Sequence, residues 1–227
     1  MDINIHPIAT IHSDFPTKFG IPRQSGVVES LRATIVFAPE YRNPDALRGI
    51  EDFSHLWLIW HFSEAVRSEW SPTVRPPRLG GNRRMGVFAT RSPFRPNSLG
   101  LSCVKLIGLE QTADCGTVVH VAGADLMDGT PIFDIKPYIP YCDCQPDALG
   151  GFTSTAGAFI LQVDFPPHLL SILPADKQAA AMDVLSHDPR PSYQNSPEKI
   201  YGLSFAGFDI RFTVESNILH VKEVIPL

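Results

Sequence analysis

The proline content is the feature that most limits the folds open to this chain. Proline occupies 21 of the 227 positions, and glycine occupies a further 16. Proline lacks the amide donor that helix interiors and central strands need, so regular elements in such a chain are interrupted often. We therefore expect a loop-rich β protein rather than a helical bundle.

Length and composition indicate one large globular domain, or one domain with a smaller companion. The chain is about one and a half times the length of a domain of roughly 150 residues. Hydrophobic residues make up 44% and charged residues 19%, which argues against disorder. The longest strongly apolar run, 55–62, is far shorter than the roughly 18 residues of a membrane span. Residues 1–10 lack the pattern of a signal peptide, so we expect a cytoplasmic protein without membrane association.

Short apolar patterns predict strands in the first 145 residues. Apolar residues alternate with other residues across 31–37, which is typical of a strand with one buried face. The run 55–62 is continuously apolar, and we expect a strand buried on both faces. Asn43-Pro44 predicts the start of a short helix. Further strands are expected at 86–90, 101–109, 116–122 and 132–135. Together these elements predict a small antiparallel β-barrel or a sandwich.

The composition changes after residue 145. Residues 145–157 are rich in Gly, Ser, Thr and Ala, as in a linker. Beyond them we expect one helix at 176–186 and strands at 158–163, 200–205, 207–214 and 218–224. We therefore divide the chain into a β domain, residues 1–145, and a small α+β domain, residues 146–227.

The charge is unevenly distributed. The net charge is −5, but residues 67–105 contain eight cations and one acid, a local charge of +7, which leaves −12 for the rest. Seven of the eight cations are arginine, which suits bidentate contact with phosphate. This segment is expected to form an anion-binding surface, although pairing with carboxylates elsewhere in the fold would also explain it.

Several common kinds of site are absent from the sequence. No two glycines are separated by one residue, which excludes the dinucleotide-binding loop of Rossmann folds. The phosphate-binding lysine loop, the zinc-protease motif and the hydrolase serine motif are also missing. Cys142 and Cys144 flank Asp143 and could oxidise or bind a soft metal, but we favour free thiols in a reducing cytosol and expect no metal site.

Two segments combine side chains that could carry chemistry. In the proline-stiffened loop, Arg91 and Arg95 lie four residues apart and suit a ligand carboxylate or an RNA phosphate. Ion pairs with aspartates at 125, 128 or 134 are the structural alternative. On a strand, Asp134 and Lys136 project from the same face and can pair. That pair would tune a proton acceptor if it lies in a cleft, and otherwise it stabilises the strand.

An ordered set of motifs along nearly the whole chain resembles the TsaA-like family, whose bacterial members are the TrmO-type tRNA methyltransferases. The motifs are Pro22-Arg23-Gln24, Ser54-His55-Leu56-Trp57, Arg75-Pro76-Pro77-Arg78-Leu79-Gly80-Gly81-Asn82, Met85-Gly86-Val87-Phe88-Ala89-Thr90-Arg91-Ser92, Arg95-Pro96-Asn97, Asp128-Gly129-Thr130-Pro131, Asp134-Ile135-Lys136-Pro137-Tyr138, Asp188-Pro189-Arg190-Pro191-Ser192-Tyr193 and Phe208-Asp209-Ile210-Arg211.

The resemblance implies an S-adenosylmethionine-dependent enzyme. Family members methylate N6 of threonylcarbamoyladenosine at position 37 of tRNA, beside the anticodon. Their fold is a small β-barrel unrelated to Rossmann methyltransferases, and they are homodimers with the cofactor near the subunit interface. We therefore expect a homodimer that acts on the anticodon stem-loop of tRNA. A methyltransferase for another substrate and a non-enzymatic RNA-binding module remain the alternatives.

The resemblance also implies which residues contact the cofactor. This chain has Ser63-Glu64 where relatives often have His-Gln, and backbone contacts there could survive the exchange. The expected cofactor contacts are Pro22, Arg23, Gln24, Ser63, Glu64, Arg91, Leu101, Asp128, Gly129, Thr130 and Pro131.

Catalytic and RNA-binding roles follow as hypotheses. The N6 nitrogen needs a proton acceptor, because the carbamoyl group withdraws its lone pair. We assign that role to Asp134, with Tyr138 positioning the base and Lys136 setting the local charge. Phe94 or Tyr138 would stack on bases. Arg95 and Asn97 would hold the threonyl carboxylate or a nearby phosphate. The expected RNA-binding residues are Arg75, Arg78, Arg84, Arg95, Asn97 and Arg190.

Overall fold

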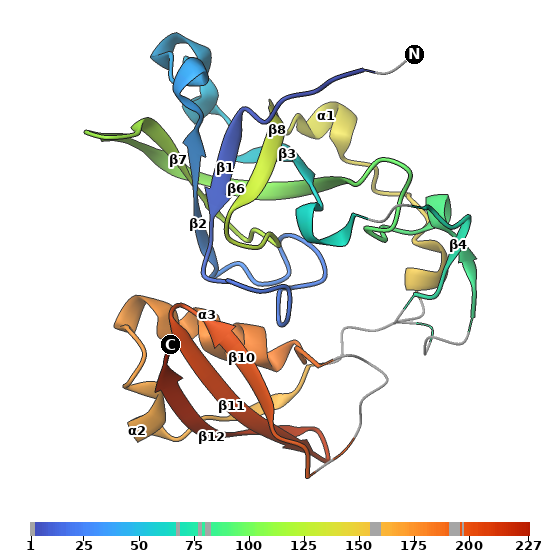
Figure 1. Ribbon diagram of the computed structural model, residues 1–227, viewed down its shortest axis with the longest axis vertical. Coiled ribbons are helices and arrows are strands. Elements are labelled where there is room, and N and C mark those ends of the chain that lie inside the picture. Colours follow the sequence, from blue (N-terminus) through green and yellow to red (C-terminus); the bar gives the residue numbers. More distant parts are fainter. Residues whose placement is uncertain are drawn as a thin grey trace.

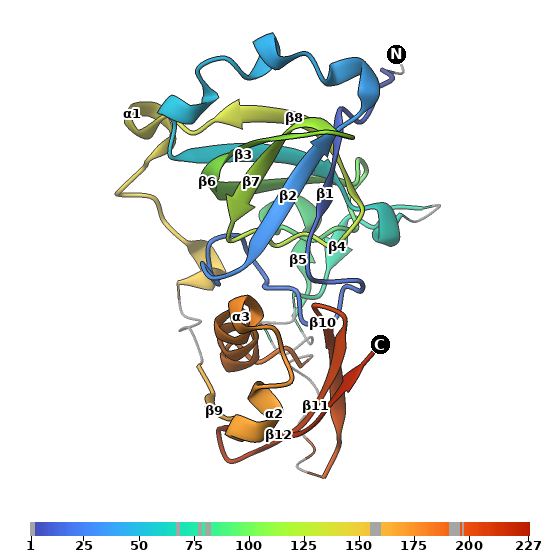
Figure 2. The same cartoon turned by 90° about the vertical axis from the view of Figure 1, so that its left-hand side faces the viewer.

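A computed structural model describes residues 3–66, 69–76, 79, 83–154, 160–190, 196 and 198–227 (Figure 1). The chain forms two units, each built around its own β-sheet (Figures 1 and 2). The prediction of a mainly β chain with a smaller C-terminal unit of mixed structure is confirmed. No helix in this described part has the length and apolar character that crossing a membrane requires.

Six antiparallel strands build the first unit, and each strand pairs with two neighbours. Their order is β1-β2-β7-β6-β3-β8, and β8 pairs with β1, so the sheet closes into a barrel. Closure pairs the two edges that an open sheet would expose to other chains. The strands are β1 (Ala9–His12), β2 (Arg32–Phe37), β3 (His55–His61), β6 (Leu99–Thr112), β7 (Gly116–Ala122) and β8 (Thr130–Pro137).

Alternation along each strand fills the barrel interior. In β2 the side chains of Ala33, Ile35 and Phe37 are buried, as the period of two predicts. The same alternation occurs in β3, so the prediction that this strand is buried on both faces is wrong. The outer residues Trp57 and Ile59 are only half-buried, because the wall of a barrel has no second sheet behind it.

Three connections leave the barrel at one end. Residues 13–31 join β1 to β2, residues 62–98 join β3 to β6, and residues 123–129 join β7 to β8. These connections meet at the same end because neighbouring strands run in opposite directions. We call this end of the barrel the loop end.

The connection 62–98 contains short regular elements. The two-stranded hairpin of β4 (Thr73–Val74) and β5 (Met85–Gly86) lies between the 3₁₀ helices η4 (Ser63–Ala65) and η6 (Val87–Ala89). The strand expected at 86–90 is therefore wrong beyond Gly86, since the chain turns into η6 at Val87.

The opposite end of the barrel carries the connection 38–54 between β2 and β3 and the turn 113–115 between β6 and β7. The helix expected after Asn43 is the 3₁₀ helix η2, capped by the Asn43 side chain, which accepts a bond from the Asp45 amide at 3.0 Å. The turns between β2 and β3 are η1 (Pro39–Tyr41), η2 (Pro44–Leu47) and η3 (Ile50–Asp52). After β8 the chain forms α1 (Pro140–Asp143) and η7 (Gly151–Thr153).

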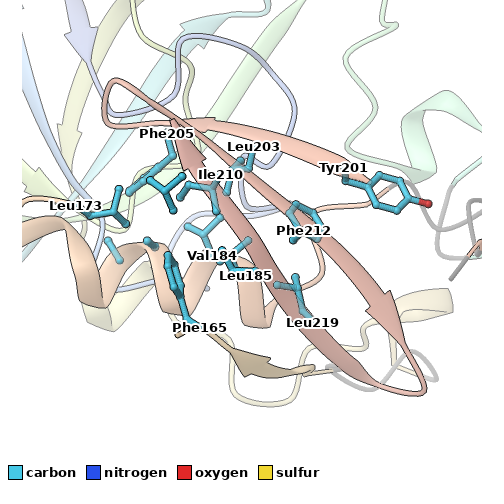
Figure 3. Close-up of a cluster of buried hydrophobic side chains, with 14 of the residues drawn as sticks. Phe165, Leu173, Val184, Leu185, Tyr201, Leu203, Phe205, Ile210, Phe212 and Leu219 are labelled. Atoms are coloured by element: carbon cyan, nitrogen blue, oxygen red, sulfur yellow. The ribbon is translucent and has the colours of Figure 1, made fainter. Parts of the chain in front are cut away.

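The second unit is a four-stranded sheet covered by helices. The strand order is β10-β11-β12-β9, and β9 runs parallel to β12. Val184 and Leu185 of the long helix pack against the sheet residues Leu203 and Ile210 in one buried cluster (Figure 3). The helix and the last three strands are confirmed within one or two residues. The elements are β9 (Gln162–Asp164), α2 (Pro167–Leu170), α3 (Ala175–Ser186), β10 (Tyr201–Phe205), β11 (Phe208–Glu215) and β12 (Ile218–Pro226).

The connection 13–31 joins the two units. Phe15 is 1% exposed and belongs to the core of the second unit, where its ring lies 5.3 Å from that of Phe205. Val28 and Leu31 belong to the same core. A partly buried ion pair at 2.7 Å joins Asp14 to Lys177 of α3. The β1–β2 connection is therefore held by the C-terminal unit as well as by the barrel.

Candidate functional site

The predicted cofactor residues gather at the loop end of the barrel. They are separated by as many as 109 positions in sequence but lie on the three connections or on the strand starts next to them. Pro22, Arg23 and Gln24 lie on the first connection, and Ser63, Glu64 and Arg91 lie on the second. Leu101 is near the start of β6, and residues 128–131 lead into β8.

Gln24 links two of these connections. The guanidinium of Arg91 donates to the Gln24 side-chain oxygen, and the Gln24 amide donates to the Arg23 carbonyl. Neighbouring bonds fasten the first connection to the connection 123–129 and to β6. The Gly26 amide donates to the Gly123 carbonyl at 2.8 Å, and the Cys103 amide donates to the Ser25 hydroxyl at 3.1 Å.

Arg91 and Arg95 differ in what holds them. No ion pair joins either arginine to an aspartate among the residues that the structure describes. Arg91 is exposed and touches Gln24, which leaves further guanidinium donors for a ligand. Arg95 instead donates to the carbonyls of Val87 at 3.3 Å and Thr90 at 2.7 Å, so it also stiffens its own loop.

The turn at 128–131 is tied to the first connection. The Asp128 carboxylate accepts from the Ser13 amide and lies against the His12 ring, both at 3.1 Å. The Asp128 amide donates to the Phe15 carbonyl at 2.8 Å. Gly129 has φ +77°, a conformation that side chains disfavour. These bonds give the turn a fixed shape while its carboxylate stays partly exposed.

Ser63 and Glu64 are exposed and lie in η4, immediately after β3. The Phe62 amide donates to the Ser98 carbonyl at 2.9 Å, which continues the β3–β6 pairing up to this point. Neither side chain makes a hydrogen bond within the described part of the chain. Their place beside the start of β6 agrees with a cofactor contact, which stays a prediction.

Asp125 lies at this end, and the sequence suggested it only as a possible ion-pair partner of the loop arginines. Its carboxylate accepts from the Ser102 hydroxyl at 2.5 Å, and that hydroxyl accepts from the Trp60 indole at 3.0 Å. Burial raises the pKa of Asp125, while the Ser102 bond and the nearby Arg91 charge lower it in part. Asp125 is thus joined through Ser102 to the buried Trp60 indole and lies within the electrostatic influence of Arg91. Its partners lie far away in sequence, so no local pattern could have revealed the network.

Exchanging Asp125 for asparagine is expected to change how stability depends on pH. A raised folded-state pKa means that the folded chain holds its proton more tightly than the unfolded chain, whose pKa is about 3.9. Loss of the Asp125 proton therefore lowers the free energy of unfolding progressively as pH rises from about 4 through the folded-state pKa of Asp125. Asp125→Asn removes the titrating carboxyl group and keeps a side-chain oxygen that can accept from the Ser102 hydroxyl. Urea unfolding measured across this pH range should show a smaller loss of stability in the variant than in wild type.

The exposed Asp147 supplies a control for that comparison, because Asp147→Asn removes the same charge from a residue outside the network of Asp125, Ser102 and Trp60. Its unfolding free energy should follow the wild-type pH dependence. Identical slopes for wild type and Asp125→Asn would contradict the assignment.

Two of the predicted catalytic residues, Asp134 and Lys136, lie on the outer face of β8. Asp134 and Lys136 pair at 2.8 Å, which confirms that they share a face. Asp134 lies opposite Ile59, which in turn pairs with Leu101, so Asp134 and Leu101 are two strand spacings apart, about 10 Å. The structure therefore brings Asp134 near one predicted cofactor residue.

Tyr138 does not share that location. Its amide donates to the His55 carbonyl at 2.9 Å, and its ring lies 5.8 Å from that of Trp57. His55 begins β3, whereas the loop end lies beyond His61. Four residues of strand separate the positions of Tyr138 and Asp134, about 13 Å. Tyr138 is therefore not brought beside the loop-end residues of its own chain.

The predicted RNA contacts fall into four groups. Arg95, described above, is half-buried and bonded to the carbonyls of its own loop. Arg75, Arg84 and Asn97 are exposed on the connection 62–98. Arg78 lies outside the described residues. The prediction that Arg190 contacts RNA is wrong, because the residue is 8% exposed. Its Nε and Nη2 atoms donate to the two carboxylate oxygens of Asp188 at 2.8 and 3.0 Å. Its guanidinium holds the start of the segment after α3 and is not available to RNA.

The described part of the chain contains no group of three His, Cys, Asp or Glu side chains that could hold a metal ion. A shallow pocket of about 390 Å³ lies where the barrel meets the second unit. Its lining includes His12, Asp14 and Lys177 but none of the predicted cofactor residues. The predicted cofactor residues therefore lie outside this pocket.

Comparison with known proteins identifies the relatives of both units. The family model described as the tRNA-methyltransferase O N-terminal domain matches residues 10–144, and that of the TrmO C-terminal domain matches residues 160–227. An Escherichia coli protein named tRNA (adenine(37)-N6)-methyltransferase is 40% identical over 215 residues, 91% of each chain.

Further relatives agree with these matches. A Pseudomonas aeruginosa protein named as a putative S-adenosylmethionine-dependent methyltransferase is 37% identical over 93% of each chain. The crystal structure of TrmO from P. aeruginosa superposes with a TM-score of 0.80 at 31% identity, covering 100% of this chain and 98% of the other. On these matches to both of its units, the chain belongs to the TrmO family of tRNA methyltransferases.

Proposed function

We propose that this protein uses S-adenosylmethionine to methylate N6 of threonylcarbamoyladenosine at position 37 of tRNA. The observation that carries the proposal is the meeting of three distant motifs at the loop end, joined by the bond between Arg91 and Gln24. The names of the relatives support tRNA adenine-37 as the target and S-adenosylmethionine as the methyl donor.

The donor set at the loop end fits this cofactor. The Arg91 guanidinium suits the carboxylate of the methionyl group. The partly exposed Asp128 carboxylate suits the ribose hydroxyls or the ammonium group. Leu101 is 57% exposed and offers an apolar surface at the start of β6. When bound, the cofactor would supply an electrophilic methyl group on a positively charged sulfur.

The residues of this chain would prepare the nucleophile. Asp134 is the proposed acceptor of the N6 proton, and its pairing with Lys136 at 2.8 Å holds the carboxylate in place. Arg95 and Asn97 would hold the threonyl carboxylate, because both lie between the Arg91 loop and the start of β6. Partial exclusion of water and close positioning would supply the rest of the rate enhancement.

The oligomeric state, the part of the tRNA that is bound, the location and the domain bounds belong to the same proposal. We propose a homodimer that binds the anticodon stem-loop in the cytoplasm, with the chain divided into domains at residues 1–145 and 146–227. Sedimentation of the purified protein tests the dimer. Tyr138 would serve such a dimer only if the partner subunit brings it to the loop end.

Removing the Arg91 side chain is expected to weaken cofactor binding about 10- to 100-fold, because a hydrogen bond to a charged group contributes about 1.5–3 kcal/mol. Calorimetric titration with S-adenosylmethionine measures the effect in Arg91→Ala. The matched control is Arg48→Ala, which removes an exposed arginine from the opposite end of the barrel. Equal affinities for all three proteins would contradict the proposed site.

Transfer of labelled methyl groups tests the substrate. Wild type should methylate tRNA that carries threonylcarbamoyladenosine and should not methylate the same tRNA with unmodified adenosine at position 37. Cofactor binding together with methylation of the unmodified tRNA would indicate another substrate. Absence of cofactor binding in a folded protein would favour a non-enzymatic RNA-binding module.

Asp134→Asn separates the acceptor from a structural role. We expect a loss of kcat with unchanged cofactor affinity, since Asp134 is assigned to the proton and not to the cofactor. Full turnover by this variant would remove Asp134 from the mechanism.

A further inference from the structure

Two large aromatic side chains lie exposed side by side on the connection 62–98. Trp70 is 53% exposed and Phe88 is 74% exposed. Their ring centroids are 6.2 Å apart, and the planes are inclined by 31°. Exposing two such rings together forgoes the burial that normally stabilises aromatic residues, which marks the pair as a contact surface. We call Trp70 and Phe88 the aromatic pair.

The aromatic pair is held by a stiff support. The β4–β5 hairpin pairs Thr73 with Gly86, and the Val87 amide donates to the Pro72 carbonyl at 2.9 Å. The Arg95 guanidinium lies 5.9 Å from the centre of the Phe88 ring, and its Nη1 bonds to the carbonyls of Val87 and Thr90. A surface fixed in this way loses little conformational entropy when a ligand binds.

The charge around the aromatic pair identifies the kind of partner. Arg75 follows β4 and Arg84 precedes β5, so they occupy facing positions one step beyond the Val74–Met85 pair. Like charges at facing positions repel each other. Arg75, Arg83 and Arg84 are exposed, and none is ion-paired within the residues described. A polyanion would relieve this repulsion, whereas a second copy of the same surface would increase it.

We propose that the aromatic pair stacks on an unpaired base of the RNA substrate while Arg75 and Arg84 contact the neighbouring phosphates. Aromatic rings beside exposed arginines are the usual way in which proteins hold single-stranded RNA. This inference rests on the proposed function and names the part of the substrate recognised, a single-stranded nucleotide next to the target adenosine. It replaces Tyr138, which lies toward the other end of the barrel, and half-buried Phe94 as the stacking residues.

Binding of a synthetic anticodon stem-loop RNA, followed by fluorescence anisotropy, tests the inference. Trp70→Ala and Phe88→Ala should each weaken binding roughly 5- to 100-fold, since a stacked base contributes about 1–3 kcal/mol. Trp70→Phe should retain most of the affinity. Tyr141→Ala, which removes an 89% exposed ring elsewhere on the chain, should leave binding unchanged. A blunt RNA duplex without a loop should bind all variants equally.

Salt dependence separates the two kinds of contact. Trp70→Ala should leave the slope of log affinity against log salt unchanged, whereas Arg75→Ala and Arg84→Ala should each make it shallower. Wild-type stem-loop affinity in Trp70→Ala and Phe88→Ala would overturn the inference. So would an equal loss for loop and duplex, or a change in sedimentation that shows the pair to be a subunit interface.

Methyl transfer measured on the same preparations keeps the two proposals distinct. If Trp70→Ala methylates tRNA with wild-type KM, the stacking role fails while the proposed function stands. If wild type binds the cofactor but methylates no tRNA, the proposed function fails. Loss of stem-loop binding in the alanine variants would then still show base stacking.

Discussion

Replacing Phe15 with alanine is expected to lower the free energy of unfolding by about 3–5 kcal/mol, the range for deleting a buried phenyl ring. Phe15 is 1% exposed and packs on Phe205 inside the C-terminal unit, although it belongs to the connection between β1 and β2. Urea unfolding of Phe15→Ala measures the effect. Phe88→Ala removes the same ring from an exposed position, and its stability should stay within about 0.5 kcal/mol of wild type.

Phe15→Ala is also expected to disturb the predicted cofactor residues. The connection that carries Phe15 also carries Gln24, and the Asp128 amide bonds to the Phe15 carbonyl. If the ring no longer anchors this segment, the bond between Arg91 and Gln24 loses its support. At a temperature where Phe15→Ala is still folded, S-adenosylmethionine should bind more weakly than to wild type. Wild-type cofactor affinity in the folded variant would show that the C-terminal unit does not position this site.

Gly100→Ala is the second substitution with a large expected effect. A Cβ atom at Gly100 would lie 2.2 Å from Cε2 of Trp60 and within 2.5 Å of two further atoms of that indole. The ring is 7% exposed and hydrogen-bonded to Ser102, so it has little room to move. Overpacking of this kind costs about 1–3 kcal/mol and occasionally more, and we expect the upper end.

Gly108→Ala is the matched control for this prediction. Gly108 lies on the same strand, β6, and a Cβ atom there would meet no atom of the described residues within 4 Å. Thermal unfolding should therefore give a clearly lower Tm for Gly100→Ala and a nearly unchanged Tm for Gly108→Ala. Similar values for the two variants would show that the indole moves aside at small cost. Displacement of Trp60 would also disturb Asp125, because both side chains bond to the Ser102 hydroxyl. Comparison with Asp125→Asn allows this part of the effect to be recognised.

The elements predicted most accurately from sequence are those in which a long periodic pattern agrees with burial. The strand β2 is the clearest example, because its apolar alternation matches the face that the fold buries. For α3 the sequence predicted the bounds within one residue, whereas the buried face is formed by Ala180, Ala181, Val184 and Leu185. β1 was not predicted, since it has four residues and gains its stability from pairing with β2 and β8 on both sides. Pairing partners that lie far away in the chain leave no local signal.

The candidate site, too, has parts that the sequence predicted and parts that it could not predict. The motif residues of the loop end could be chosen from sequence, because the motifs that contain them resemble those of the TsaA-like family. The hydrogen bonds that these residues make could not be predicted from the sequence. Asp125 and the aromatic pair depend on distant partners, and the sequence pattern suggested Arg190 as a surface arginine although the fold buries it against Asp188.

By itself, the sequence determined the class of the fold, the family and the side chains available for chemistry, because these follow from local patterns of polarity, turns and motifs. Only the tertiary structure decided which side chains meet. Closure of the barrel brings three connections to one end, and burial of Phe15 makes the C-terminal unit part of the support for that end. Such contacts depend on the simultaneous packing of segments far apart in the chain, which no single segment encodes.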